Sequence, residues 1–306
     1  MNPNLFENVL TFPNSDYPER YTALVGLDDI KHRLEKEAET LIRPDKLEAW
    51  SKKHHGAKLK VLNTLIRRPP LFIFAGDVGT GKTELSITFG DRIARLADID
   101  IELFSLSLNT RGSGAVGEMT RLITEAFREL KARCPKPHTG KKPIGAAILV
   151  IDEADSLAQS RELTQMHHED RAGVNALIRG IDEIAASKLP CIVVMCTNRL
   201  DALDPAVRRR AAATFQFERP NQEFREKIIQ DNLGEAGLTN SEIIKVAELL
   251  GETHGRKYGY TFSDITQRYL PSLVLAAYPD QKIGYELASG IAKSILPTPP
   301  FKHTSG

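Results

Sequence analysis

The sequence predicts an α/β fold, with a parallel five-stranded sheet sandwiched by helices and a small α-helical domain behind it. Short apolar runs, typical of strands buried on both faces, alternate with helical patterns as far as Pro220. Strands and helices that alternate in this way are typical of a parallel sheet covered on both sides. After Pro220 the strand-like runs stop, and only helical patterns continue.

The expected strands are short runs made almost wholly of apolar residues. They lie at 71–75, 101–106, 146–151, 191–196 and 214–217. The expected helices have apolar residues spaced at three and four positions, which places those residues on one helix face. They lie at 30–42, 81–97, 119–130 and 174–184, and behind Pro220 at 224–229, 243–250, 262–277 and 283–296.

This order of elements divides the chain into four parts. Residues 1–20 are expected to form an irregular arm, because they hold three prolines. Residues 21–220 form the large α/β domain, and residues 221–296 form the small helical domain. Residues 297–306 are polar and are expected to be a flexible tail.

Composition excludes several classes of protein. Apolar residues make up 41% and charged residues 26% of the 306 residues, which excludes a largely disordered chain. The net charge of +1 argues against a nucleic-acid partner. No apolar run is long enough to span a membrane, and the first residues lack the pattern of a secretion signal. With only three cysteines, the chain is expected to be cytoplasmic.

Residues 76–83 predict a phosphate-binding loop. They match the pattern G-x-x-x-x-G-K-[ST] between an expected strand and an expected helix. Glycines let backbone N–H groups surround phosphate oxygens, Lys82 would reach the β- and γ-phosphates, and the Thr83 hydroxyl would bind Mg²⁺. The residues expected to bind ATP here are Gly76, Asp77, Val78, Gly79, Thr80, Gly81, Lys82, Thr83 and Glu84.

Asp152 and Glu153 directly follow the apolar strand expected at 146–151. Two adjacent carboxylates at the end of a buried strand are costly unless a cation or a reaction needs them. We expect Asp152 to bind Mg²⁺ and Glu153 to orient and polarise the attacking water. The alternative is that Asp152 or Asp155 caps a following helix, which the upstream phosphate loop disfavours.

Two further positions complete the expected catalytic set. Asn198 follows the strand at 191–196, where its side-chain amide could lie beside the γ-phosphate. The alternative is that this asparagine only stabilises a turn. Arg208, Arg209 and Arg210 precede the last expected strand. An arginine fork is suited to a γ-phosphate bound by a neighbouring subunit, and a solvated basic helix end is the alternative.

These motifs, in this order, resemble those of the AAA+ ATPase family of P-loop NTPases. The resemblance begins at Val25 and Gly26, which are similar to the family's adenine-side segment, and extends into the helical domain. It implies ATP and Mg²⁺ as cofactors, with ATP bound between the phosphate loop and a helical lid. It also implies a homo-oligomeric ring, usually a hexamer, with a catalytic arginine supplied in trans.

A narrower resemblance is to the pachytene-checkpoint subfamily, whose members remodel HORMA-domain proteins. It rests on the sequences at 151–157 and 174–182 and on Arg210 followed by alanine. Ala213 stands where most AAA proteins carry a second arginine, so the resemblance assigns the trans arginine to Arg210 alone. Residues 1–20 are too short for the adaptor-binding domain of eukaryotic members. They fit short bacterial homologues in anti-phage systems, which pair the ATPase with a HORMA-like protein and a nucleotidyltransferase.

Three segments bear on how a ring would engage its substrate and nucleotide. Ala115 occupies the aromatic position of the expected central-pore loop, so a threaded peptide would lose its main contact. Residues 159–171 are a candidate second pore loop. Ser263 stands where some members place a nucleotide-sensing arginine, and Arg268 is the candidate substitute about one turn later.

The sequence thus predicts a ring-forming ATPase that remodels a protein partner, with a HORMA-domain protein as the favoured substrate. The alternatives are a nucleic-acid-engaged motor or loader, an activase of an unrelated enzyme, and a nucleotide-dependent scaffold. The near-neutral charge disfavours the first, and the intact set of Lys82, Asp152, Glu153 and Arg210 disfavours the last. The fold cannot separate an activase from the favoured function.

Overall fold

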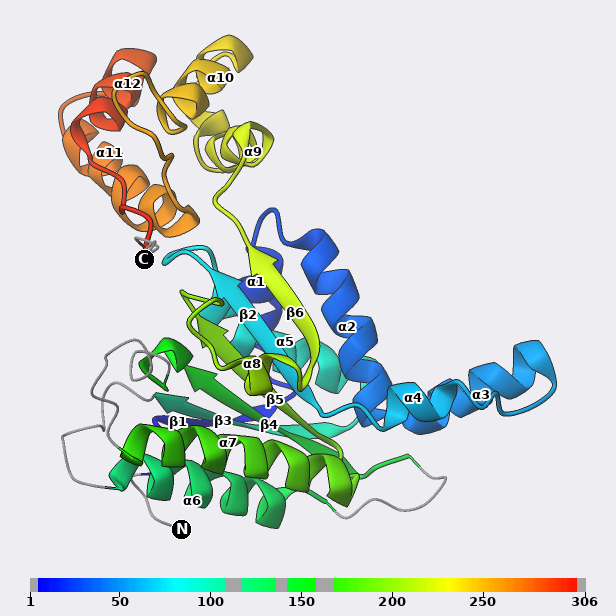
Figure 1. Cartoon of the computed structure of the whole chain (residues 1–306). Coiled ribbons are helices and arrows are strands. Elements are labelled where there is room, and N and C mark those ends of the chain that lie inside the picture. Colours follow the sequence, from blue (N-terminus) through cyan, green and yellow to red (C-terminus); the bar gives the residue numbers. More distant parts are fainter. Residues whose placement is uncertain (1–4, 108–116, 136–141, 158–167, 302–306) are drawn as a thin grey trace. The chain divides into compact units, whose positions relative to one another are not determined.

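The computed structural model describes residues 5–107, 117–135, 142–157 and 168–301. It forms two compact units (Figure 1). The α/β unit comprises Met1–Ala23, Asp29–Ala75 and Thr83–Gln216, and the helical unit comprises Leu24–Asp28, Gly76–Lys82 and Phe217–Gly306. The pore-loop expectation at Ala115 and most of the one at 159–171 lie outside the described residues.

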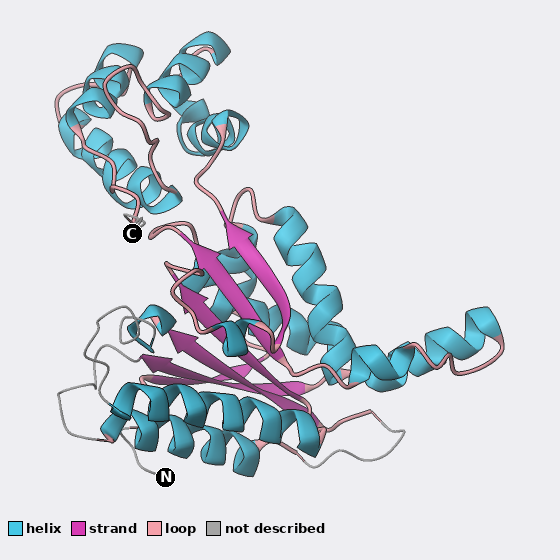
Figure 2. Ribbon diagram, in the orientation of Figure 1, coloured by secondary structure: helices cyan, strands magenta, loops and turns pink. Residues whose placement is uncertain are grey.

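The α/β unit is built on a six-stranded sheet in the order β1-β3-β4-β5-β2-β6 (Figure 2). The strands are Asn8–Phe12 (β1), Leu71–Gly76 (β2), Asp100–Ser107 (β3), Gly145–Asp152 (β4), Cys191–Thr197 (β5) and Ala211–Phe217 (β6). Strands β3, β4, β5 and β2 run parallel to one another. Their carboxyl ends therefore share one sheet edge, where ligands of open α/β sheets bind. The predicted α/β fold is confirmed, with a sheet that is mostly rather than wholly parallel.

The arm predicted to be irregular contributes the sixth strand, so the predictions of an irregular arm and of five strands were wrong. Strand β1 pairs antiparallel with β3, with Val9 opposite Phe104. Only Phe12 of β1 is buried, because an edge strand has one partner and keeps much of its surface in water. A short helix, Tyr17–Thr22 (α1), follows in the same arm.

Helices cover both faces of the sheet. They are Asp28–Ile42 (α2), Lys82–Ala97 (α5), Glu118–Arg133 (α6), His168–Ser187 (α7) and Pro205–Arg208 (α8), with a 3₁₀ turn at Ala154–Leu157. Two further helices, Pro44–His55 (α3) and Leu62–Ile66 (α4), extend to the side of the sheet (Figure 1). Phe74 of β2 packs against Phe89 of α5, with ring centroids 6.4 Å apart. Helices α6 and α7 cover the other face (Figure 1).

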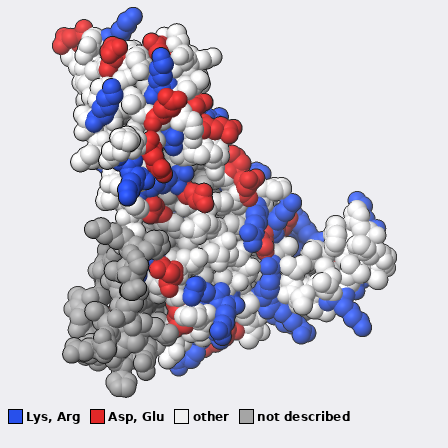
Figure 3. All heavy atoms as spheres, turned by 45° about the horizontal axis from the view of Figure 1, so that its top comes forward, with Lys and Arg blue, Asp and Glu red and all other residues white. Residues whose placement is uncertain are grey.

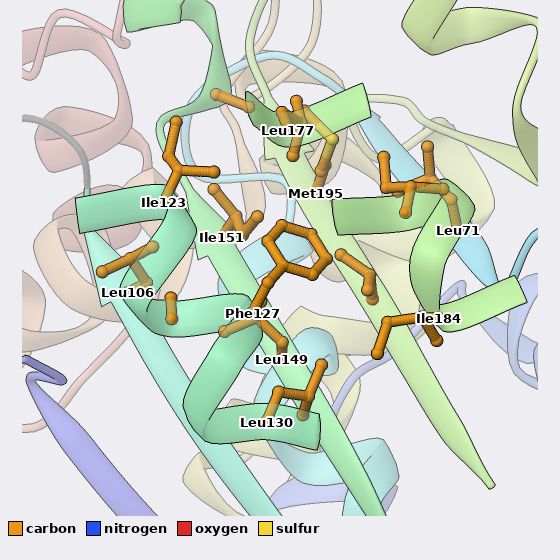
Figure 4. Packing of buried hydrophobic residues seen from close by; sticks show 14 of the residues in the cluster. Leu71, Leu106, Ile123, Phe127, Leu130, Leu149, Ile151, Leu177, Ile184 and Met195 are labelled. Carbon is orange, nitrogen blue, oxygen red and sulfur yellow. The ribbon is translucent and has the colours of Figure 1, made fainter. Parts of the chain in front are cut away.

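The core under α6 and α7 fixes strands β4 and β5, whose carboxyl ends carry candidate site residues. Phe127 of α6 lies among Leu149 and Ile151 of β4 and Met195 of β5 (Figure 4). A side chain at Gly180 of α7 would meet the Phe127 ring at 2.4 Å, so only glycine fits this crossing. Each fully buried side chain of this size contributes roughly 1.5–3 kcal/mol.

The helical unit is a bundle of short helices. They are Gln222–Leu233 (α9), Asn240–Leu249 (α10), Leu270–Ala277 (α11) and Tyr285–Ser294 (α12), with a 3₁₀ turn at Gly234–Ala236 and a π-helix at Asp264–Tyr269. The Tyr260 hydroxyl donates to the carbonyl of Ala292 at 2.9 Å, and the Tyr269 hydroxyl donates to that of Ala288 at 3.2 Å. Among the described residues, none of the helices has both the length and the apolar character needed to cross a bilayer.

The start of the predicted flexible tail is bound to the helical unit. Asp264, which is 1% exposed, accepts hydrogen bonds from the backbone N–H and the hydroxyl of Thr298 at 2.9 and 2.8 Å. It also accepts the N–H of Thr261 and a guanidinium N–H of Arg268. The prediction of a flexible tail over residues 297–306 was therefore wrong at Thr298.

We expect Asp264→Asn to lower the free energy of unfolding by about 1–3 kcal/mol at pH 7, because it weakens a buried hydrogen-bond network. Burial raises the pKa of Asp264, but the hydrogen bonds from Thr261, Thr298 and Arg268 outweigh burial and hold the pKa below its ordinary value. This stabilisation is present above the unfolded-state pKa of about 3.9 and is lost as pH falls through the folded pKa.

Urea unfolding followed by circular dichroism at pH 7 and near pH 3.5 measures the effect of Asp264→Asn. The difference between wild type and variant should shrink at the lower pH. The exposed Asp280, changed to asparagine, is the matched control and should show no difference at either pH. An Asp264→Asn effect that is equal at both values of pH contradicts the ionic contribution.

Candidate functional site

The loop that follows β2, predicted to bind phosphate, turns on three glycines with unusual backbone conformations. Gly76, Gly79 and Gly81 all have positive φ, at 154°, 75° and 94°. A Cβ atom at Gly76 would lie 2.1 Å from the carbonyl oxygen of Phe217, and one at Gly79 would lie 2.6 Å from the Thr261 hydroxyl. Glycine is therefore required at both positions by space as well as by conformation.

Lys82 places its ammonium group inside this loop. The side chain is 6% exposed, and Nζ donates to the carbonyl oxygens of Gly76 at 2.8 Å and Asp77 at 2.6 Å. The Thr80 hydroxyl also donates to the Asp77 carbonyl, at 2.8 Å. The loop thus holds a positive charge among backbone groups at the N-terminus of α5, where a phosphate is stabilised.

The α/β unit brings Thr83 and Asp152 together. The Thr83 hydroxyl, in the first turn of α5, donates to Oδ2 of Asp152 at 2.8 Å. Asp152 is the last residue of β4, so the end of the sheet fixes its carboxylate. A hydroxyl and a carboxylate are the hard oxygen ligands that Mg²⁺ prefers, and these two residues fit a Mg²⁺ site shared with phosphate oxygens.

Glu153 has a backbone conformation that is unusual for a residue with a side chain. Its φ is +54°, in the left-handed region, and its N–H donates to Oδ1 of Asp152 at 2.8 Å. Residues other than glycine are uncommon in this region, and such backbone strain concentrates at functional sites. Asp152 therefore uses one oxygen to contact Thr83 and the other to hold the turn that carries Glu153.

Asp155 connects the ends of two strands, a role that sequence reasoning missed. It is 7% exposed, and Oδ1 accepts the Thr197 hydroxyl at 3.5 Å and the Asn198 N–H at 3.4 Å. Asp155 thus contacts residues at the end of β5, and these contacts differ from the helix cap that was the alternative. Asn198 is placed at the same sheet edge as Asp152 by the parallel pairing of β4 with β5.

Arg210 is bound to another residue of its own chain. Its guanidinium makes a two-pronged ion pair with Asp182 of α7, with Nε–Oδ1 2.7 Å and Nη2–Oδ2 2.9 Å. The hydrogen bond to Asp182 raises the pKa of Arg210. Arg208 and Arg209 are exposed, and Ala213 is buried in β6. Asp182 is therefore a second residue that sequence reasoning left without a role of its own.

Within the helical unit, Arg219 contacts both the predicted phosphate loop and two segments behind Pro220, at Gly259 and Thr298. Nε lies 2.8 Å from Oδ2 of Asp77, and Nη1 donates to the carbonyls of Gly259 at 2.6 Å and Thr298 at 2.9 Å. Asp77 thus contacts Arg219 through its side chain, while its carbonyl oxygen accepts hydrogen bonds from Lys82 and Thr80. Arg219 directly precedes Pro220, and the change of pattern at this proline was its only signal in the sequence.

Two other residues expected to bind ATP, Gly79 and Gly26, lie close to residues that follow Pro220. The N–H of Ser263 donates to the Gly79 carbonyl at 3.1 Å. Gly26 has φ +75°, and a Cβ atom there would meet the Phe224 ring at 2.8 Å, while Val25 packs against the core of the unit. Arg268, the candidate sensor, donates to Asp264 at 2.8 Å. Its guanidinium therefore supports the anchor of the tail.

Glu84 differs from its expected role. Its carboxylate is bound by Arg20 of α1, with contacts of 2.8 and 2.9 Å. Its contribution to a phosphate is therefore limited to its backbone N–H, which lies in the first turn of α5, where N–H groups have no partner within the helix. Among the described residues, no three His, Cys, Asp or Glu side chains are grouped to hold a metal ion.

Comparison with known proteins agrees with this geometry. Residues 72–219 match the model of the "ATPase family associated with various cellular activities (AAA)". The chain is 51% identical to CD-NTase-associated protein 6 of Escherichia coli strain MS 115-1, over 97% of this chain and 96% of the relative.

Two solved structures are also similar. The structure of an E. coli MS115-1 HORMA:CdnC:Trip13 complex contains a chain with TM-score 0.89 and 49% identity, covering 99% of this chain and all of the other. The structure of Rhizobiales Trip13 gives TM-score 0.73 and 44% identity, over 96% and 100% of the two chains. The chain therefore belongs to the AAA ATPase family.

Proposed function

We propose that this chain is a Mg²⁺-dependent ATPase that acts as a hexameric ring in the cytoplasm and remodels a HORMA-domain protein in an anti-phage signalling system. Family membership implies nucleotide binding and ATP hydrolysis. The observation that supports the HORMA substrate most directly is the full-length similarity to the Trip13 chain of a HORMA:CdnC:Trip13 complex. The same similarity supports a nucleotidyltransferase as an associated partner. Three free, buried cysteines suit the reducing cytoplasm.

In this proposal each residue of the site has a separate role in ATP hydrolysis. Bound Mg²⁺ would neutralise charge on the β- and γ-phosphates, and Thr83 and Asp152 are placed to hold it. Lys82 and the loop amides bind the phosphates, and Glu153 accepts hydrogen bonds from the attacking water and polarises it. Asn198 lies at the sheet edge beside them and orients that water. Arg210 of a neighbouring subunit stabilises charge on the transferring phosphoryl group.

We expect Glu153→Gln to bind ATP normally and to hydrolyse it at least about 100-fold more slowly, because it removes the base that polarises water. The glutamine keeps the size of the side chain, so the turn held by Asp152 is retained. The stalled protein should hold its substrate with ATP and release it with ADP. Phosphate release and co-purification of a tagged bacterial HORMA-domain protein measure the two effects.

Glu235→Gln is the matched control, because Glu235 is an exposed glutamate of the helical unit. It should leave turnover and binding unchanged. Normal turnover by Glu153→Gln would contradict the catalytic assignment. If the stalled protein ignores HORMA-domain protein but holds nucleic acid in an ATP-dependent, salt-sensitive way, the substrate assignment is wrong and a nucleic-acid motor replaces it.

A further inference from the structure

We propose that the α/β unit carries a second binding site, which takes an acidic peptide segment of a partner protein with an aliphatic anchor residue. The site is a pocket of about 640 Å³. It is formed by the end of α2, by α3 and α4, by the end of α7, and by the residues that begin β2 and β5. A volume of this size lies within the range of ligand pockets, about 300–1,000 Å³. We call it the base pocket.

Within the α/β unit, the base pocket lies at the opposite end of the parallel strands from Asp152 and Asn198. Pro70 and Cys191, at the amino ends of β2 and β5, line it. Asp152 and Asn198 lie at the carboxyl ends of the parallel strands. Because each strand residue advances about 3.3 Å, the two edges are about 20 Å apart. The base pocket shares no residue with the proposed ATPase site.

Aliphatic side chains form the inner wall of the base pocket. Ile66 of α4, Ala185 of α7 and Leu189 after α7 line it, and all three are only half-buried. Apolar surface left open inside a concavity is typical of a site for an apolar ligand group. None of the described lining residues is aromatic, which favours an aliphatic side chain over a stacked nucleic-acid base as the ligand group.

Three cations that line the base pocket have no acidic partner among the described residues. They are Lys52, Arg67 and Lys188, and all three are exposed. The other charged lining residues are already paired: Asp45 with Arg43, Glu48 with Lys58, and Arg68 with Glu37. The free charge of these lining residues is therefore positive, and its complement is a ligand with carboxylates beside its apolar group.

The segment that contains α3 and α4 also carries an excess of positive charge. Residues 49–76 contain no Asp or Glu but six Lys or Arg, although the whole chain has a net charge of only +1. Figure 3 shows Lys and Arg side chains over the lobe formed by α3 and α4. Trp50 of α3 is 47% exposed. Exposed apolar surface beside free cations fits a protein partner better than a small anion.

The test selects binders from a random dodecapeptide phage library on the full-length protein. Enriched peptides should carry at least two acidic residues next to Leu, Ile or Met. An enriched peptide, synthesised with a fluorophore, should bind by anisotropy, and its affinity should fall at least tenfold in the double variant Arg67→Glu/Lys188→Glu. It should fall as much in Ala185→Trp, which fills the apolar wall without changing charge.

Lys282→Glu, an exposed lysine of the helical unit, is the matched control and should bind within twofold of wild type. Basal ATP hydrolysis should be unchanged in all of these variants, and thermal melting checks that each is folded. The proposal is overturned if no peptide is enriched, if enriched peptides lack acidic residues, or if Ala185→Trp binds as wild type. A short oligothymidylate that binds more tightly than the peptide and is released by the same variants would also overturn it, in favour of a nucleic-acid site.

Discussion

Lys82→Ala is expected to remove most of the ATP affinity of this protein and, with it, the hydrolysis. The Lys82 ammonium is nearly inaccessible to water and contacts two carbonyls of the phosphate loop. Removing one partner of a desolvated charge pair costs about 2–5 kcal/mol, because the phosphates keep their charge and lose their cation. This cost corresponds to a roughly 30- to 4,000-fold loss of affinity.

Calorimetric titration with ATP and Mg²⁺ measures this loss for Lys82→Ala. Lys82 also holds the loop through its carbonyl contacts, so the melting temperature without nucleotide is needed to separate binding from folding. Lys282→Ala, which removes an exposed lysine, is the control and should bind as wild type. An affinity of the folded Lys82→Ala protein within threefold of wild type would contradict the assignment of the phosphate loop.

The features that could be predicted from the sequence are those that one short segment specifies by itself. Strands such as Leu71–Gly76 and Gly145–Asp152 are buried along nearly their whole length, so their composition alone identifies them. The phosphate loop was predicted for the same reason. Its glycines are required by backbone conformation and close contacts that belong to the loop and its immediate neighbours.

The features that were missed depend on contacts between distant segments. Strand β1 has a mixed composition and becomes a strand only through pairing with β3. Thr298 belongs to a polar segment and is fixed only because Asp264 is buried beneath it. The roles of Arg219 and Asp155 likewise rest on hydrogen bonds to residues far along the chain. No local pattern encodes such a partner.

Arg210→Ala should bind ATP with little change and hydrolyse it about 1,000-fold more slowly, because an arginine supplied to the γ-phosphate contributes about 10³–10⁵ to the rate. The ion pair of Arg210 with Asp182 cannot explain such a loss. Both side chains are partly exposed, at 30% and 49%, and an exposed pair contributes at most about 1 kcal/mol to stability. A large loss of rate with an unchanged melting temperature therefore marks a catalytic contact rather than a structural one.

The adjacent arginines supply the matched controls for Arg210. Arg208 and Arg209 are exposed residues of the same run, so Arg208→Ala and Arg209→Ala remove the same charge a few ångströms away. They should hydrolyse ATP within about threefold of wild type. Equal losses in all three variants would favour the alternative of a solvated basic patch over a single catalytic arginine.

Mixing two inactive proteins tests whether Arg210 acts on a neighbouring subunit. Arg210→Ala keeps an intact phosphate loop, and Lys82→Ala keeps an intact Arg210. A ring assembled from both therefore contains interfaces at which an intact site faces an intact arginine, and hydrolysis should reappear in proportion to those interfaces. Rings formed after denaturation and joint refolding guarantee the exchange of subunits. As a control, Lys82→Ala mixed with wild type should retain activity. If this control is active but rings of Lys82→Ala and Arg210→Ala stay inactive, then Arg210 acts on the ATP of its own subunit. Its ion pair with Asp182 is then the conformation in which it acts.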